Sequence, residues 1–94
     1  MALWEYQQKV QEVNDRKGYT SDLLTLTLGV CEEAGELAKA VNMKIRLYVP
    51  KAGAVSESIE HEIGDLLVYI FSVANSAGID LDEIMEKKLS KGAK

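Results

Sequence analysis

Hydrophobic residues recur at steps of three and four over most of this 94-residue chain, and this spacing places side chains on one face of an α-helix. The first such segment covers about residues 3–16, and Gly18 is placed to end it. The second follows a capping hydroxyl at Thr20 or Ser21. It is expected to end before Pro50, because the residue before a proline avoids helical dihedrals.

The second half of the chain predicts two more helices. One is expected to be capped by Ser56 and to end at Gly78, and the other covers about residues 81–89 after a capping-box-like start at Asp80. Residues 47–55 connect the two long central helices. Such a short connection favours an antiparallel pair.

The predicted fold class is all-α, an antiparallel helical bundle of about four helices in a single domain over residues 1–94. Apolar residues surround most of both central helices, as Leu24 and Leu28 show on one and Leu67 and Phe71 on the other. Two short terminal helices cannot cover so much apolar surface. We therefore expect a homo-oligomer, a dimer or a tetramer, to complete the bundle.

The composition is that of a folded domain, with 47% hydrophobic and 28% charged residues and a single proline. The formal charge of −4 argues against nonspecific nucleic-acid binding, which needs a basic surface. The longest apolar run, residues 66–71, is far short of the roughly 20 residues that span a bilayer. Residues 1–5 lack the order of a signal peptide. These features predict a cytoplasmic protein with no nucleic-acid and no membrane partner.

Two further expectations concern burial. Cys31 is the single cysteine and lies in an apolar helix face, so we expect a small buried hydrophobe and neither a disulfide nor a cysteine-rich zinc site. In the last helix, Ile84 and Met85 are expected to point inward.

The candidate chemistry lies in two acidic motifs on the central helices. Glu33 and Glu36 are three residues apart, as are Glu62 and Asp65, so each pair shares one helix face. Two such faces opposed would form a cluster of four carboxylates. A pair of like charges about 4 Å apart costs roughly 4 kcal/mol at an effective dielectric of about 20, so the cluster needs cations or protons. Hard oxygen ligands favour Mg²⁺ or Mn²⁺, which points to phosphate chemistry.

The same residues resemble a known family. The pattern Glu32-Glu33-x-x-Glu36 followed by Glu62-x-x-Asp65 is similar to the E-E-x-x-E…E-x-x-D signature of the MazG-like, all-α nucleoside triphosphate pyrophosphohydrolases. The surrounding runs at residues 33–40, 62–69 and 77–81 fit as well, and the resemblance extends over about residues 26–86. Two spaced acidic motifs, each in an apolar helical frame, are much harder to meet by chance than one.

The resemblance implies a magnesium-dependent enzyme, with Mn²⁺ as a substitute, that hydrolyses a nucleoside triphosphate substrate to the monophosphate and pyrophosphate. Glu33, Glu36, Glu62 and Asp65 would hold one or more cations, which bridge phosphate oxygens and lower the pKa of an attacking water. Glu32 would be the base for that water or a residue that orients it. Relatives in the family assemble as dimers and tetramers.

Four residues are candidates for substrate binding. Tyr69 lies one turn beyond the second acidic motif, and the resemblance places it near the nucleotide, whereas the alternative is a core tyrosine. Lys51 stands at the central turn and could meet phosphate oxygens or simply carry solvated charge. Trp4 could stack on a base or pack in the core. Lys88 belongs to the basic tail, although residues 92–94 depart from the family's usual ending.

The acidic motifs leave three alternatives to this function. A di-iron bundle would need Glu-x-x-His on its helices, but the only histidine, His61, follows Ser58 by three residues and is expected to be a surface residue on another face. Phosphoribosyl-ATP pyrophosphohydrolase is a relative with similar acidic residues and a similar size, although the turn at residues 46–50 is more similar to the MazG-like enzymes. A noncatalytic helical interaction module would show no metal-dependent pyrophosphate release. Nothing in the sequence specifies the base or the sugar.

Overall fold

The computed structural model describes residues 2–45 and 58–90, and in this part the secondary structure is entirely helical. The prediction of an all-α protein is confirmed for this part of the chain. The helices and their bounds are α1 (Leu3–Lys17), α2 (Leu23–Ile45), α3 (Ile59–Ala77) and α4 (Leu81–Ser90). The predicted Lys51 and Ser56 lie outside the described residues.

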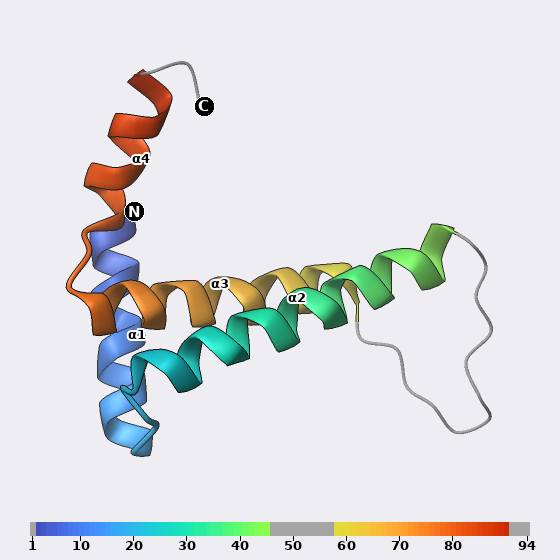
Figure 1. Ribbon diagram of the computed structural model, residues 1–94, viewed down its shortest axis with the longest axis horizontal. Coiled ribbons are helices and arrows are strands. Elements are labelled where there is room, and N and C mark those ends of the chain that lie inside the picture. The colour runs from blue at the N-terminus through green and yellow to red at the C-terminus, as the bar shows by residue number, and fades with distance from the viewer. Residues whose placement is uncertain (1, 46–57, 91–94) are drawn as a thin grey trace.

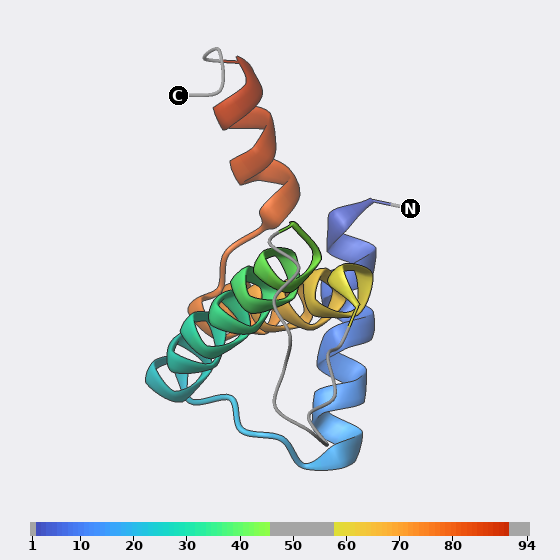
Figure 2. The same ribbon diagram turned by 90° about the vertical axis from the view of Figure 1, so that its right-hand side faces the viewer.

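Helices α2 and α3 form an antiparallel hairpin, and α1 crosses one end of it (Figure 1). The chain bends by 103° between α3 and α4. Helix α4 therefore leaves the hairpin instead of packing along it, as Figure 2 also shows. Within the described part of one chain, the helices do not close into a four-helix bundle.

The helix ends confirm part of the predicted capping. Gly18 and Gly78 have φ angles of 69° and 70°, and this left-handed conformation, which costs glycine little, ends α1 and α3 as expected. Asp22, and not Thr20 or Ser21, caps α2, since its carboxylate accepts hydrogen bonds from the Thr25 backbone at 2.9 Å and the Thr25 hydroxyl at 2.6 Å. These two bonds, the hydroxyl bond foremost, lower the pKa of Asp22.

The start of α3 also differs from the prediction. Its N-cap is Ser58, whose hydroxyl accepts a hydrogen bond from the His61 backbone at 3.1 Å. A cap at Ser58 brings the first turn of α3 two residues closer to Glu62 than the predicted cap at Ser56 would. At α4, the Asp80 carboxylate accepts from the Asp82 and Glu83 backbones at 2.9 and 3.3 Å, as the capping-box-like pattern predicts.

Helix α1 is tied to the corner between α3 and α4 by polar contacts. The Asp82 carboxylate accepts hydrogen bonds from the backbones of Leu3 and Trp4 at 3.0 and 2.9 Å, so a residue of α4 caps α1. The buried Gln7 side chain donates to Ile79 O at 2.8 Å and accepts from Leu81 N at 2.9 Å. These bonds fix the direction in which α4 leaves the hairpin.

The hydrophobic core of the described chain is small, and its buried apolar side chains are Leu26, Ala40, Phe71 and Ala74. The Tyr6 ring stacks on Phe71 at 6.1 Å between centroids.

Several predicted burial positions are wrong for the single chain. Ile84 and Met85 are exposed because α4 leaves the hairpin. Cys31 is also exposed, on a part of α2 that the described helices leave uncovered. On α3, the apolar residues Ile63 and Ile70 are exposed, whereas Glu62 is buried. In one chain, the hairpin thus covers the acidic face of α3 and leaves much of its apolar face in water.

Among the described helices, none is by itself long and apolar enough to cross a membrane, and the bent pair of α3 and α4 meets that test only jointly, on length and composition.

Candidate metal centre

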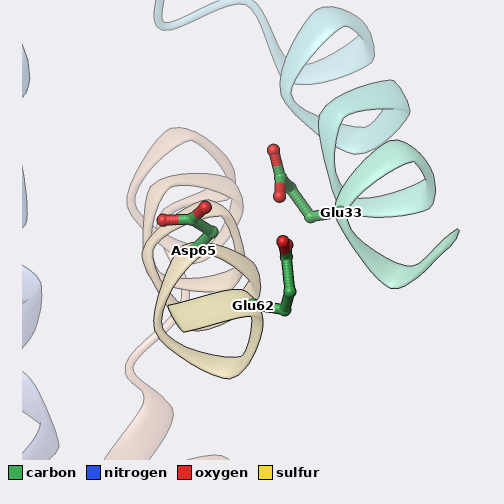
Figure 3. Close-up of side chains that lie close together, drawn as sticks. All are labelled: Glu33, Glu62 and Asp65. Atoms are coloured by element: carbon green, nitrogen blue, oxygen red, sulfur yellow. The ribbon is translucent and has the colours of Figure 1, made fainter. Parts of the chain in front are cut away.

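Three carboxylates meet between the two helices of the hairpin. Glu33 reaches from α2 toward Glu62 and Asp65 on α3 (Figure 3). One oxygen atom from each lies within 4.8 Å of the oxygen atoms of the other two. We call Glu33, Glu62 and Asp65 the acidic triad. The structure thus brings together three of the four predicted metal ligands.

The helical geometry explains why these three residues converge. Glu62 and Asp65 are three residues apart and share one face of α3. Helix α2 runs antiparallel to α3 (Figure 1), and Glu33 lies on it opposite these two acids (Figure 3). The triad is also withdrawn from water: Glu62 is only 4% exposed, and Glu33 and Asp65 are half-buried.

The electrostatics of the triad are unfavourable without a cation. Burial raises the pKa of Glu33, and the negative charges of Asp65 and Glu62 raise it further. The charges of Glu32 and Glu36 act in the same direction. The metal-free protein therefore holds a proton at Glu33 more tightly than an ordinary glutamate does.

Glu36 and Glu32 lie near the triad but do not belong to it. Both are exposed on α2, Glu36 about one turn beyond Glu33 and Glu32 directly before it. Their negative charges reach Glu33, as the raised pKa of that residue indicates. The roles predicted for Glu36 as a ligand and for Glu32 as a base stay predictions.

A contact between His61 and the triad was not predicted from the sequence. The Nε2 atom of His61 lies 3.0 Å from Oδ2 of Asp65, one turn further along α3. His61 is exposed, as expected, but it does not point to another face. The signal was present in the sequence, because residues at positions i and i+4 are neighbours on a helix.

Tyr69 packs in the groove between the helices, directly beside the triad. Its ring occupies the space that a Cβ atom on Gly29 would need. Gly29 lies one turn before Glu33 on α2, and Tyr69 lies one turn after Asp65 on α3, so the two residues form the next layer of the hairpin. The absence of a side chain at position 29 is what admits the ring.

The other predicted substrate contacts are not brought to the triad in the single chain. Trp4 lines a shallow hollow with Ala74 and Gly78, which lie nine and thirteen residues beyond Asp65, or roughly 14 to 20 Å along α3. Lys88 is exposed on α4, the helix that leaves the hairpin. Roles for both residues stay predictions, as does the role of Lys51.

The donor set of the triad suits a hard divalent cation. All three side chains offer carboxylate oxygens, from two helices whose backbone bonds hold them in place. Oxygen-only ligands favour Mg²⁺ or Mn²⁺ over zinc or copper. A cation there would also offset the repulsion that raises the pKa of Glu33. The residues therefore fit a magnesium or manganese ion.

The fold and the site together define a class: an all-helical protein with a carboxylate centre inside a helix hairpin. Residues 21–94 match the MazG nucleotide pyrophosphohydrolase domain. This match covers most of the chain, and the chain belongs to the MazG family. The family predicted from the acidic motifs is thus confirmed.

A protein of Bacillus subtilis is similar in both sequence and structure. YpjD of strain 168, an uncharacterized protein, is 37% identical over 76 residues, which are 81% of this chain and 68% of YpjD. The crystal structure of YpjD from Bacillus subtilis, described there as a candidate pyrophosphatase, superposes with a TM-score of 0.79 at 31% identity. That superposition covers 93% of this chain and 88% of the other.

Proposed function

We propose that this protein hydrolyses a nucleoside triphosphate to the nucleoside monophosphate and pyrophosphate with the help of Mg²⁺. The observation that supports this most directly is the acidic triad, formed across two helices by the very motif that defines the resemblance to the MazG family. Three carboxylates would repel an anionic triphosphate unless a cation lay between them. The charge of the site therefore favours a metal-dependent reaction on phosphates.

Each residue of the site has a distinct part in this proposal. Glu33, Glu62 and Asp65 would hold the cation, with Glu36 as a further ligand. His61 donates a hydrogen bond to Asp65 and so orients that carboxylate. When bound, the metal ion offsets the negative charge of the phosphate oxygens and lowers the pKa of water.

The reaction consumes one water molecule. The phosphoanhydride linkage between the α and β phosphates breaks, and the water supplies the additional oxygen that the two products carry between them. Glu32, exposed directly beside the triad, is the candidate to accept the proton of that water. The products are the monophosphate, pyrophosphate and a proton.

The proposed active form is a homo-oligomer, a dimer or a tetramer. Many large apolar side chains of the described chain are exposed, among them Leu24 and Leu28 on α2 and Leu67 and Ile70 on α3. A second copy would also close the bundle that one chain leaves open.

A panel of ribo- and deoxyribonucleoside triphosphates tests the proposal, assayed with Mg²⁺ for pyrophosphate and for the identity of the monophosphate. The panel includes phosphoribosyl-ATP, because its hydrolysis would distinguish a phosphoribosyl-ATP pyrophosphohydrolase from a nucleoside triphosphate pyrophosphohydrolase. We expect equal amounts of pyrophosphate and monophosphate, and none after chelation of the metal. Release of orthophosphate, or no release from any member of the panel, would contradict the proposal.

A further inference from the structure

A cavity of about 480 Å³ opens at the end of the hairpin, where α1 crosses α2 and α3. Pockets for small ligands usually have volumes between about 300 and 1,000 Å³. Its wall combines the rings of Tyr19 and Tyr69 with the aliphatic side chains of Val13, Leu26 and Val68. It is therefore large enough, and apolar enough, for a flat organic group.

The cavity and the acidic triad lie along the same groove. On α3, Tyr69 and Ser72 line the cavity and follow Asp65 by four and seven residues, or roughly 6 and 10 Å along the helix. On α2, Thr25 lines the cavity and precedes Glu33 by eight residues, or roughly 12 Å. Because the helices are antiparallel, both distances run in the same direction. Tyr69 thus lies between the cavity and the triad.

One polar side chain in the cavity is oriented by its hydrogen bonds. The Ser72 hydroxyl donates to Val68 O at 2.9 Å, so its oxygen must accept from Asn14 Nδ2, also at 2.9 Å. This sets which end of the Asn14 carboxamide faces Ser72. The hydrogen bonds of the described residues leave its Oδ1 and its second N–H for a ligand.

We infer that this cavity holds the base of the nucleotide and that Asn14 reads the edge of that base. The inference rests on the proposed function and names the place of its substrate. A nucleobase is flat, stacks on aromatic rings and offers a donor beside an acceptor, which are the groups that one carboxamide can pair with. With the phosphates at the triad, a base in the cavity lies at the other end of one nucleotide.

The placement differs from base stacking by Trp4, which was one of the two alternatives that the sequence offered for that residue. Trp4 precedes Asn14 by ten residues, roughly 15 Å along α1, and lines the hollow on the other side of the α1 crossing. Asn14 itself was not singled out from the sequence. It follows Val10 by four residues, so a polar side chain on the apolar face of that helix was the available signal.

Asn14→Leu tests the inference, since leucine has a similar size and cannot hydrogen-bond. The matched control is Gln11→Leu, which removes a carboxamide from the same helix outside the cavity; the Gln11 side chain donates a hydrogen bond to Asp15 at 2.8 Å. We expect Asn14→Leu to lower kcat/KM for the preferred base by about 10- to 100-fold and to flatten the ranking of the four bases. Gln11→Leu should leave that ranking unchanged.

A second readout does not depend on turnover. In a ¹⁵N spectrum of the whole protein, the Asn14 side-chain amide signals should shift when the monophosphate of the preferred base is added, while those of Gln11 stay in place. Asn14→Asp, which keeps the size and offers acceptors only, should change the order of the bases and covers the case in which the leucine variant fails to fold.

The outcomes separate the two proposals. No pyrophosphate from the wild type would overturn the proposed function, and the amide shifts would still decide where nucleotides bind. Normal turnover with an unchanged base ranking in both Asn14 variants, an equal loss for all four bases, or an unmoved Asn14 amide would overturn the base assignment alone.

Discussion

The ring of Tyr69 lies in the space that a side chain on Gly29 would occupy, so these two residues set how closely α2 and α3 approach. The contact stands one turn from the acidic triad on both helices. We expect a change in this contact to shift Glu33 relative to Asp65. Packing and chemistry are therefore coupled at this layer of the hairpin.

Gly29→Ala should destabilise the protein and lower its activity. The new methyl group collides with the Tyr69 ring, and overpacking of this kind costs about 1–3 kcal/mol. Urea denaturation measures the loss of unfolding free energy. Gly35→Ala is the matched control on the same helix, since a Cβ atom there meets nothing within 4 Å. It should instead stabilise α2 by about 0.5–1 kcal/mol. Equal effects of the two variants would rule out this coupling.

Removal of one charge from the metal centre should abolish activity and leave the fold intact. Asp65→Asn and Glu36→Gln are each expected to lower kcat/KM more than 100-fold, because the cation loses a ligand or its attraction. Circular dichroism should show unchanged helix content. Glu60→Gln, an exposed acid in the first turn of α3, is the control and should retain nearly full activity. Normal turnover by Asp65→Asn would show that the metal lies elsewhere.

The stability of the metal-free protein should depend on pH through Glu33. Its folded-state pKa is raised above the ordinary 4.5, so the folded protein keeps this proton to higher pH than the unfolded chain does. The resulting stabilisation is present below pH 4.5 and is lost as the pH rises through the raised pKa. Glu33→Gln has no such proton to lose.

The melting temperatures of wild type and Glu33→Gln, measured in chelator from pH 4 to 8, check this prediction. The difference between them should grow in favour of the variant as the pH rises. Added Mg²⁺ should reverse the order at pH 8, since only the wild type keeps the full ligand set. A difference that does not vary with pH would contradict the raised pKa.

Divalent cations should stabilise the folded protein by mass action. At a free concentration of one hundred times Kd, the gain is about 2.7 kcal/mol, which raises the Tm of a domain of this size by roughly 10 to 20 °C. We expect Mg²⁺ and Mn²⁺ to do so, and Ca²⁺ to bind without supporting turnover because its bonds are longer and its geometry looser. Differential scanning fluorimetry is the measurement. No shift at millimolar Mg²⁺, with and without nucleotide, would count against the metal centre.

Light scattering behind size exclusion should find a homo-oligomer at micromolar concentration. Each large apolar side chain left in water forgoes roughly 1.5–3 kcal/mol of burial, and the described chain exposes several such side chains on α2 and α3. Leu67→Glu and Leu28→Glu should shift the mass toward the monomer. A monodisperse mass near 10.4 kDa for active wild-type protein would refute the oligomer.

The helices and their ends follow from local chemistry, and the sequence was sufficient for most of them. The spacing of apolar residues predicts α1 to α4 within a residue or two at the described ends, and glycine at positions 18 and 78 marks two of these ends because φ is positive there. The acidic motifs also sufficed for the family. Spacing along one helix and residue type are properties that the chain has before it folds.

The composition of the site depended on tertiary structure. Glu33 and Glu36 share one face of α2, yet only Glu33 meets Glu62 and Asp65, because the approach of α3 decides which part of that face lies in the groove. The bend after Gly78 likewise decides that Ile84 and Met85 face water in the single chain, against a periodicity that predicts burial.

The N-cap of α2 shows the difference between what the sequence predicts and what the folded structure decides. Thr20, Ser21 and Asp22 are all capable N-caps, and the sequence cannot rank three neighbours whose side chains differ so little in that role. In the folded chain the cap is Asp22. The Ser76 hydroxyl donates a hydrogen bond to Ser21 O at 2.6 Å. The sequence by itself thus determined that this protein is helical and acidic at its centre. Only the packing of α3 against α1 and α2 decided which acids meet, because burial and contact depend on distances between residues that the chain order does not contain.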